Sequence, residues 1–219
     1  MTKFIEIPAN KKSLSLRRAK YGVGINDSLY LTNPTISGKK IMCQYYSTWS
    51  EMLKRCYSDR YQSLKPTYKG CSVCGEWLIF SAFKKWMKTQ DWKGKHLDKD
   101  ILIPDNKIYS PESCIFISVT LNNLLCSNDA SRGEYPQGVS FYRPNGKYVA
   151  QCRSGRKNRN LGFFTSIRDA EYTYLKYKSG VVLSFTNSEE VLGNKLLSDS
   201  LIKISNAMLD KAEKLMEIK

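Results

Sequence analysis

Several features that would place this chain outside the ordinary folded proteins are scarce in its 219 residues. It has 7 Pro and 13 Gly, which excludes a collagen-like or low-complexity chain, and 42% of its residues are hydrophobic, which argues against disorder. No apolar run approaches the ~20 residues that a membrane-spanning helix needs. The first 20 residues carry charges where a signal peptide has an apolar stretch. We therefore expect a folded, soluble, cytoplasmic protein with no membrane partner.

Acidic residues are also few. The chain has 20 Asp and Glu against 35 Lys and Arg, a formal net charge of +15. An excess of this size is typical of proteins that bind polyanions, and nucleic acid is the expected partner. The basic residues alternate with Tyr, Trp, Asn and Gln instead of following one face of an amphipathic helix, which disfavours a membrane-surface protein. A merely soluble basic protein is the remaining alternative.

Hydrophobic spacing predicts an α+β chain. Apolar residues three and four apart predict helices over residues 45–57, 77–87, 120–126, 166–178 and 197–215. Alternation predicts strands over residues 96–103, 114–118, 138–142, 148–153 and 160–164, the last three as an antiparallel sheet with a basic loop at 154–159. We expect a basic arm and lead-in over 1–40, a first domain over 41–128, a linker near 127–133, a second domain over 133–187 and a C-terminal amphipathic helix over 190–219.

The most informative stretch runs from Gly94 to Asn122. It reads Gly94-Lys-His-Leu-Asp-Lys-Asp100, then Asn106-Lys-Ile-Tyr-Ser-Pro-Glu-Ser-Cys114-Ile-Phe-Ile, and then reaches Asn122. It resembles the HNH nuclease family, in the bacteriophage branch with a Leu-Asp-basic-x-Asp strand followed by Tyr-Ser-Pro-Glu-x-Cys. The resemblance implies a ββα-metal core with flanking helices, in which a strand, a loop, a strand and a helix hold one divalent ion, usually Mg²⁺, against the scissile phosphate.

The resemblance assigns roles by position. Asp98 corresponds to the metal ligand on the strand and Asn122 to the ligand on the helix, with Asn123 as the alternative if the register slips. Carboxylate and amide oxygens suit a hard cation, whose other positions go to water and phosphate. The family has its general base, a His, directly after the strand acid, where this chain has Lys99. A protonated Lys cannot accept a proton from water, so the base is in question.

Two other residues are candidates for the missing base. His96, the single histidine of the chain, precedes Asp98 by two residues and so lies on the same face of the predicted strand. A structural hydrogen bond to a backbone carbonyl is the alternative role for His96. Asp100, on the same face, is a candidate for a second metal ligand or a base. The catalytic candidates are therefore His96, Asp98, Lys99, Asp100 and Asn122, and a unit that has lost its chemistry and only binds DNA stays open.

Cysteines form a second candidate metal site. Their number, seven, is odd, and in a reducing compartment they indicate thiols or metal ligands instead of disulfides. Cys71 and Cys74 have the C-x-x-C spacing of zinc ligands, and Cys56 and Cys114 flank them, so a structural four-thiolate Zn²⁺ site is one hypothesis. Cys43 competes as the fourth ligand. Ordinary buried thiols are the alternative, because free Cys is among the most buried residue types.

A third pattern lies between residues 138 and 172. Gly138-Val-Ser-Phe-Tyr-Arg143, Gly146-Lys-Tyr-Val-Ala-Gln-Cys-Arg153, Asn160-Leu-Gly-Phe-Phe-Thr165 and Asp169-Ala-Glu-Tyr are similar to an AP2 domain, a DNA-binding module also found beside HNH units in phage homing endonucleases. The resemblance implies a three-stranded sheet plus helix whose sheet enters the major groove. It places base and phosphate contacts at Ser140, Arg143, Gln151, Arg153, Asn158 and Asn160.

Alternation along the middle predicted strand, residues 148–153, is consistent with a DNA-binding sheet. It puts Gln151 and Arg153 on one face and Tyr148, Ala150 and Cys152 on the other, and a β-ribbon can enter the major groove. We expect Lys147, Arg156, Lys157 and Arg159 in turns, where a basic side chain contacts phosphates. The family's Arg and Trp contacts are partly replaced by Ser140, Asn145 and Asn160, so its sequence preference does not transfer.

The sequence thus predicts a homing-type DNA endonuclease, monomeric, that nicks double-stranded DNA with one divalent metal. If a phage encodes it, it acts in the host cytoplasm. The competing hypothesis is a non-cleaving DNA-binding protein or regulator built on a degenerate HNH unit. The residue at position 99 is the sequence feature that separates the two hypotheses.

Overall fold

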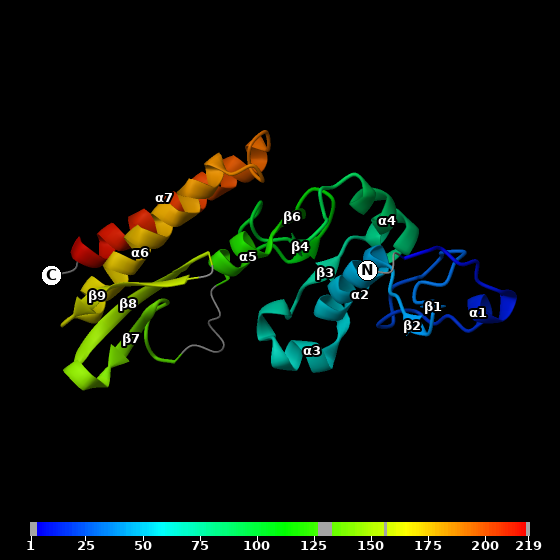
Figure 1. Ribbon diagram of the computed structural model, residues 1–219, viewed down its shortest axis with the longest axis horizontal. Coiled ribbons are helices and arrows are strands. Elements are labelled where there is room, and N and C mark those ends of the chain that lie inside the picture. Colours follow the sequence, from blue (N-terminus) through cyan, green and yellow to red (C-terminus); the bar gives the residue numbers. More distant parts are fainter. Residues whose placement is uncertain (1–3, 127–132, 156, 218–219) are drawn as a thin grey trace. The chain divides into compact units, whose positions relative to one another are not determined.

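The structure is a computed structural model that describes residues 4–126, 133–155 and 157–217, and it confirms a mixed α+β chain. The chain divides into two compact units, one up to Phe116 and one from Ile117 onward (Figure 1). The predicted linker at 127–133 lies, except for its last residue, outside the described residues. No helix within the described ranges combines the length and the apolar character of a membrane span.

Within the described residues, the first unit contains four α-helices and several short strands. The helices are α1 (Lys11–Ser15), α2 (Gln44–Tyr57), α3 (Asp59–Leu64) and α4 (Phe80–Lys88). The strands are β1 (Thr35–Ile36), β2 (Lys39–Lys40), β3 (Ser72–Val73), β4 (Lys95–Asp98) and β5 (Ile108–Tyr109), with β6 (Ile115–Ser118) at the unit boundary. They pair as β1 with β2, β3 with β5, and β4 with β6.

An aromatic core holds the first unit together. Trp49 of α2 and Trp77, Phe80 and Phe83 near α4 are fully buried, and the Trp77 and Phe83 rings pack edge to face with centroids 5.1 Å apart. Aromatic pairs of this geometry stabilise a core beyond the area they bury. The residues predicted as arm and lead-in join this unit, since Tyr30 is buried in the same core.

The predicted helix over 77–87 is confirmed from Phe80 onward, but its start was predicted too early. Trp77 lies in a separate 3₁₀ turn (Gly75–Leu78), and Ile79 between the two is extended. The cause is pairing with a distant segment: the Ile25 N–H donates to the Leu78 carbonyl at 2.8 Å, and the Phe80 N–H donates to the Ile25 carbonyl at 2.9 Å.

The second unit contains the sheet predicted from alternation. Strands β7 (Val139–Tyr142), β8 (Lys147–Ser154) and β9 (Lys157–Phe164) form an antiparallel sheet in the order β7-β8-β9, and α5 (Val119–Leu125), α6 (Ile167–Ser184) and α7 (Lys195–Glu217) are its helices. The Ser166 hydroxyl accepts the Arg168 N–H at 3.1 Å, which confirms the predicted N-cap of α6.

Helix α6, backed by α7, covers one face of this sheet. Ala150 and Cys152 of β8 are buried against Ala170 and Tyr174 of α6, and Ala212 of α7 completes this core. α7 packs along α6 (Figure 1), so the predicted C-terminal helix packs within its own unit. On the opposite face of the sheet, Gln151 and Arg153 of β8 and Asn158 and Asn160 of β9 are exposed.

Candidate functional site

The strand register assigns side chains to the two faces of the sheet. Directly opposite residues on neighbouring strands share a face, and the face alternates along each strand. Val139 pairs with Ala150, which is fully buried under α6, so the residues out of phase with these two face away from the helices. We call this side the outer face; its members are Ser140, Tyr142, Lys147, Val149, Gln151, Arg153, Asn158, Asn160 and Phe163.

Six of the ten residues predicted to contact DNA lie on the outer face. They are Ser140, Lys147, Gln151, Arg153, Asn158 and Asn160, and each has an exposed side chain. Two cross-strand pairs form its polar part, Gln151 with Asn160 and Arg153 with Asn158. The Asn160 Oδ1 accepts the Gly162 N–H at 2.9 Å, which orients that side-chain amide beside the bulge in β9.

An aromatic part of the outer face was missed from the sequence. The Tyr142 and Phe163 rings lie 5.3 Å apart, and each side chain is 44% exposed. Val149, paired with Phe163, is only 5% exposed. The signal was present in the alternation, because Tyr142 is in phase with Ser140, but the bulge that shifts the phase of β9 near Ala150 is a tertiary feature.

The remaining basic residues correct the predicted turns. Lys157 and Arg159 were expected in a loop and instead lie in β9, because the hairpin extends its ladder to the Ser154–Lys157 pair. Arg159 pairs with Cys152 and its guanidinium lies 5.3 Å from the Tyr177 ring centroid of α6, so it belongs to the helix side. Arg143 is exposed in the 3₁₀ turn after β7, and Arg156 lies outside the described residues.

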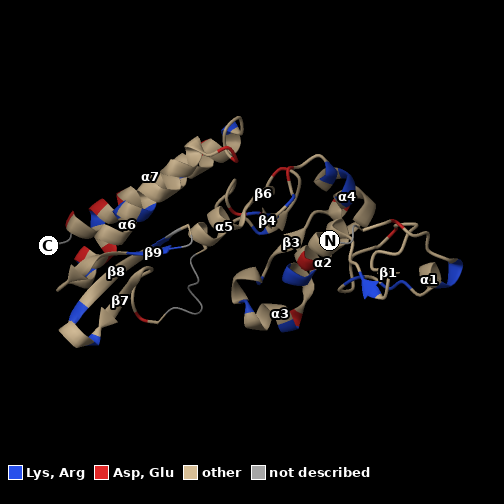
Figure 2. Ribbon diagram, viewed as in Figure 1, with Lys and Arg blue, Asp and Glu red and all other residues tan. Residues whose placement is uncertain are grey.

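The charge of the sheet is of one sign. Residues 138–164 contain no Asp or Glu, and Figure 2 shows basic positions on β8 and β9. Amide, guanidinium and ammonium groups above an uncharged aromatic patch can read base edges and contact phosphates. Gly138 fixes how closely the sheet and α6 approach, since its φ is +76° and an added Cβ would lie 2.1 Å from the Tyr174 ring.

The second candidate site is the segment around β4. The predicted strand over 96–103 ends at Asp98, because the Asp98 Oδ1 accepts the N–H groups of Asp100 and Ile101 at 2.9 and 2.8 Å and turns the chain. Asp100 therefore does not share a strand face with Asp98, which corrects that prediction. His96 stays in β4 with an exposed side chain.

The position of Lys99 is the main surprise of this segment. Its side chain is 5% exposed, its Nζ donates to the Asp100 carboxylate and, at 2.6 Å, to the Asn106 carbonyl. The Asn106 amide returns a bond to the Lys99 carbonyl at 2.9 Å. Lys99 and Asn106 thus close the loop between β4 and β5, and an ammonium held by two acceptors is a poor proton acceptor.

Asp98 has the properties of one ligand for a cation. Burial raises the pKa of its carboxyl, and the nearby Asp100 charge raises it further, against the lowering effect of the two backbone N–H bonds. Both bonds go to Oδ1, which leaves Oδ2 outside the hydrogen bonds of the described residues. A divalent ion at Oδ2 would offset the buried charge, so this residue fits the Mg²⁺ implied by the resemblance. Asp100 fits less well, because Lys99 holds it.

The helix residue of the proposed metal pair belongs to the second unit. Asn122 lies in α5 and is half-buried, with its Nδ2 4.0 Å from the Cys126 Sγ, and the exposed Asn123 follows it in the same helix. The N-terminus of α5 is fixed by the Glu190 carboxylate, which accepts the Ser118 N–H. Asp98 lies in the first unit.

Three of the predicted zinc ligands are buried, and two of them raise the pKa of the third. Cys56, Cys71 and Cys114 are buried, and burial raises the pKa of the Cys56 thiol to about 12, with a further rise from Cys71 and Cys114. Burial raises the pKa of Cys114 to about 12 as well. Cys74 is half-buried, and Cys43 lies elsewhere, 3.9 Å from the Tyr30 hydroxyl.

No group of three or more His, Cys, Asp or Glu side chains is arranged to hold a metal ion within the described residues. The zinc hypothesis stays a prediction for elemental analysis, with about one Zn per chain as its expected stoichiometry.

Comparisons of the chain with protein-family models, with curated proteins and with solved structures give no match. The case for function therefore depends on the residues themselves.

Proposed function

We propose that this chain binds double-stranded DNA with the outer face of the β7-β8-β9 sheet and acts on it as a metal-dependent endonuclease that nicks one strand. One observation carries the DNA-binding part: the register gathers Ser140, Lys147, Gln151, Arg153, Asn158 and Asn160 on a single exposed face. The same six residues are among those that the sequence predicts to contact DNA.

The chemistry of the outer face matches duplex DNA. A guanidinium donates two hydrogen bonds to guanine, and Gln or Asn amides pair with adenine in the same groove. Arg153 and Gln151 are the base-reading candidates, while Lys147 and Arg143 at the turn are placed for phosphates. The net charge of +15 supplies the general attraction to the phosphate backbone.

The nuclease part of the proposal rests on the resemblance of residues 94–122 to HNH enzymes. Asp98 and Asn122 would hold one divalent ion, which when bound supplies Lewis-acid stabilisation of the phosphate. His96 is the remaining candidate to take a proton from water, because it is exposed on β4 whereas the Lys99 ammonium is engaged by two acceptors.

A second candidate function has an observation of its own in favour. Lys99, where the HNH family has its base, is a buried loop clamp, which is what a protein that keeps the fold but has lost the chemistry would carry. Such a chain would be a non-cleaving DNA-binding protein or regulator. It keeps the same outer face and the same dependence of binding on salt.

Incubation with supercoiled plasmid separates the two functions. The endonuclease predicts conversion to the relaxed circle in Mg²⁺, none in EDTA, and none with Asp98→Asn, which keeps the acceptor for the two backbone N–H groups. A shifted plasmid band without relaxation under any divalent ion supports the non-cleaving alternative. No binding to duplex DNA at low salt refutes both.

A further inference from the structure

The first unit contains a polar pocket apart from the β4 segment. It has a volume of about 330 Å³, near the lower end of the ~300–1,000 Å³ typical of small-molecule sites. Its walls come from α1 and the loop after it, the chain before β1 and the first turn of α2: Ser13, Arg17, Arg18, Asn26, Leu31, Thr32, Asn33 and Tyr46. Two of these side chains are basic and none is acidic.

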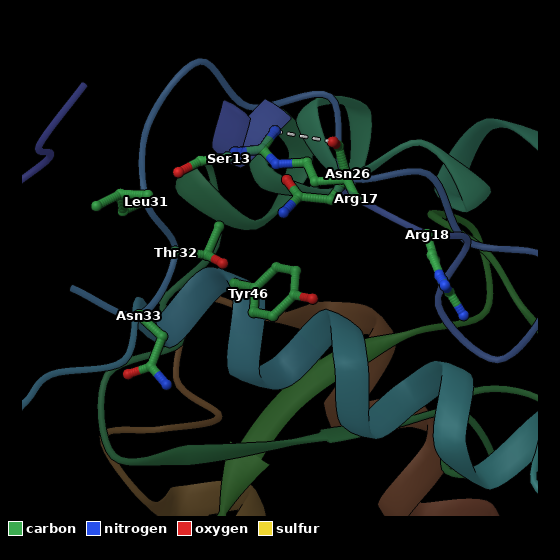
Figure 3. A pocket seen from close by; sticks show the side chains of 8 residues that line it. All are labelled: Ser13, Arg17, Arg18, Asn26, Leu31, Thr32, Asn33 and Tyr46. Carbon is green, nitrogen blue, oxygen red and sulfur yellow. Dashed lines mark hydrogen bonds between the residues drawn. The ribbon is translucent and has the colours of Figure 1, made fainter. Parts of the chain in front are cut away.

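Arg17 is held rigidly in the wall of this pocket. Its Nη1 donates to the carbonyls of Asn26 at 3.0 Å and of Ser28, and its Nη2 donates to the Tyr30 carbonyl at 2.8 Å. A guanidinium has five N–H groups, so these three bonds leave its Nε–H and one Nη2–H for another acceptor. Figure 3 shows Arg17 beside Asn26, with Thr32 and Tyr46 facing them across the pocket.

Other donors in the walls are not consumed by the fold. The Asn26 Oδ1 accepts the N–H and the hydroxyl of Ser28, so its amide NH₂ is the part left to donate. Arg18 is exposed and makes no hydrogen bond or ion pair with another described residue. The positive charge of Arg17 opposes the rise that burial causes in the Tyr46 pKa, which places that charge beside the ring.

We propose that this pocket binds the phosphate group of a nucleotide, either free or within a DNA strand. A fixed guanidinium, a second, exposed guanidinium and several neutral donors without a carboxylate form the donor set that phosphate oxygens require. The Tyr46 ring and Leu31 provide an apolar wall for the attached sugar or base. The pocket is formed within the first unit, so a negative result for phosphate binding here would not affect the proposed DNA binding by the β7-β8-β9 sheet.

Calorimetric titration of the full chain tests this site with 5′-dAMP, deoxyadenosine and a 12-base-pair duplex. Arg18→Gln should weaken binding of a phosphate-bearing probe by about tenfold, the loss expected for one charge-assisted hydrogen bond. Arg60→Gln is the matched control, because Arg60 is exposed in α3 of the same unit and does not line the pocket. It should change affinity by less than twofold.

The probes separate the sources of the phosphate. Binding of dAMP but not of deoxyadenosine, lost in Arg18→Gln, identifies a free nucleotide as a ligand. An effect of Arg18→Gln confined to the duplex identifies a backbone phosphate instead. Thr32→Val, which removes one pocket hydroxyl and keeps the shape, should weaken the same probe. Equal effects of Arg18→Gln and Arg60→Gln on the duplex, together with no binding of dAMP, overturn the proposal.

Discussion

Replacing Lys99 by Met should destabilise the first unit by about 2 kcal/mol. The Lys99 side chain is 5% exposed, and Met keeps most of its stem in contact with the same neighbours while removing the ammonium. Two bonds are lost. The bond to Asp100 is worth little, because that carboxylate is 55% exposed and surface pairs contribute ~0–1 kcal/mol. Loss of the bond to the Asn106 carbonyl leaves that acceptor unpaired in a part-buried place, at ~1–3 kcal/mol.

Urea unfolding followed by tryptophan fluorescence measures this loss, since Trp49 and Trp77 report on the core of the first unit. Lys93→Met is the matched control, because Lys93 is exposed shortly before β4, and it should change the free energy of unfolding by less than ~0.5 kcal/mol. Lys99→His should cost at least as much as Lys99→Met, since the imidazole is too short to reach the Asn106 carbonyl. A Lys99→Met protein as stable as the wild type would refute the clamp and return Lys99 to the candidate bases.

Three other changes have distinct expected outcomes. Burial raises the pKa of Asp98, so the folded protein binds the proton of this carboxyl more tightly than the unfolded chain does. The free energy of unfolding should therefore fall as the pH rises above the ordinary Asp pKa of ~3.9. Asp98→Asn should flatten that fall and raise stability at pH 7, measured by urea titrations at acid and neutral pH, and should abolish nicking in a plasmid assay. Gly138→Ala should lower stability by more than ~2 kcal/mol in thermal melts, because the new Cβ meets Tyr174, whereas Gly146→Ala, with a positive φ but open space, should cost about 1 kcal/mol. A thiol-reactive dye at pH 8 should modify the exposed Cys126 fast and the half-buried Cys74 slowly, because burial raises the pKa of the Cys74 thiol; rapid modification of the five buried cysteines would contradict their burial.

The sheet could be predicted because its signals are local. Alternation between Val139 and Phe164, with turn residues between the runs, gave the strands, and the N-cap Ser166 gave the start of α6. The same alternation placed Gln151 and Arg153 on one face, whereas Ser140, Asn158 and Asn160 came from the resemblance to an AP2 domain. The Arg159 side chain could not be assigned, because its face depends on how far the hairpin ladder extends and on the bulge near Ala150.

The β4 segment was harder to predict for a related reason. The hydrophobic pattern continues from Leu97 to Ile101, yet the Asp98 carboxylate captures two backbone N–H groups and ends the strand. Side chains that compete with the ladder for backbone donors act through geometry that periodicity does not record. The burial of Lys99 depends in the same way on Asn106, seven residues later. The break at Ile79 is a further tertiary effect, because the residues on either side of it pair with Ile25.

The most direct test of the central claim compares two arginines of the same sheet. Arg153 lies on the outer face beside Asn158, and Arg159 lies on the helix side over Tyr177. Arg153→Gln and Arg159→Gln each remove one positive charge, so a difference between them reports on which face of the sheet the side chain occupies. Fluorescence anisotropy measures their affinities for the preferred site and for a set of its single-base-pair variants. Arg153→Gln should cost ~1–3 kcal/mol with the loss concentrated at one base pair, whereas Arg159→Gln should weaken all sites slightly and evenly. Equal, uniform losses in the two variants would contradict DNA reading by the outer face.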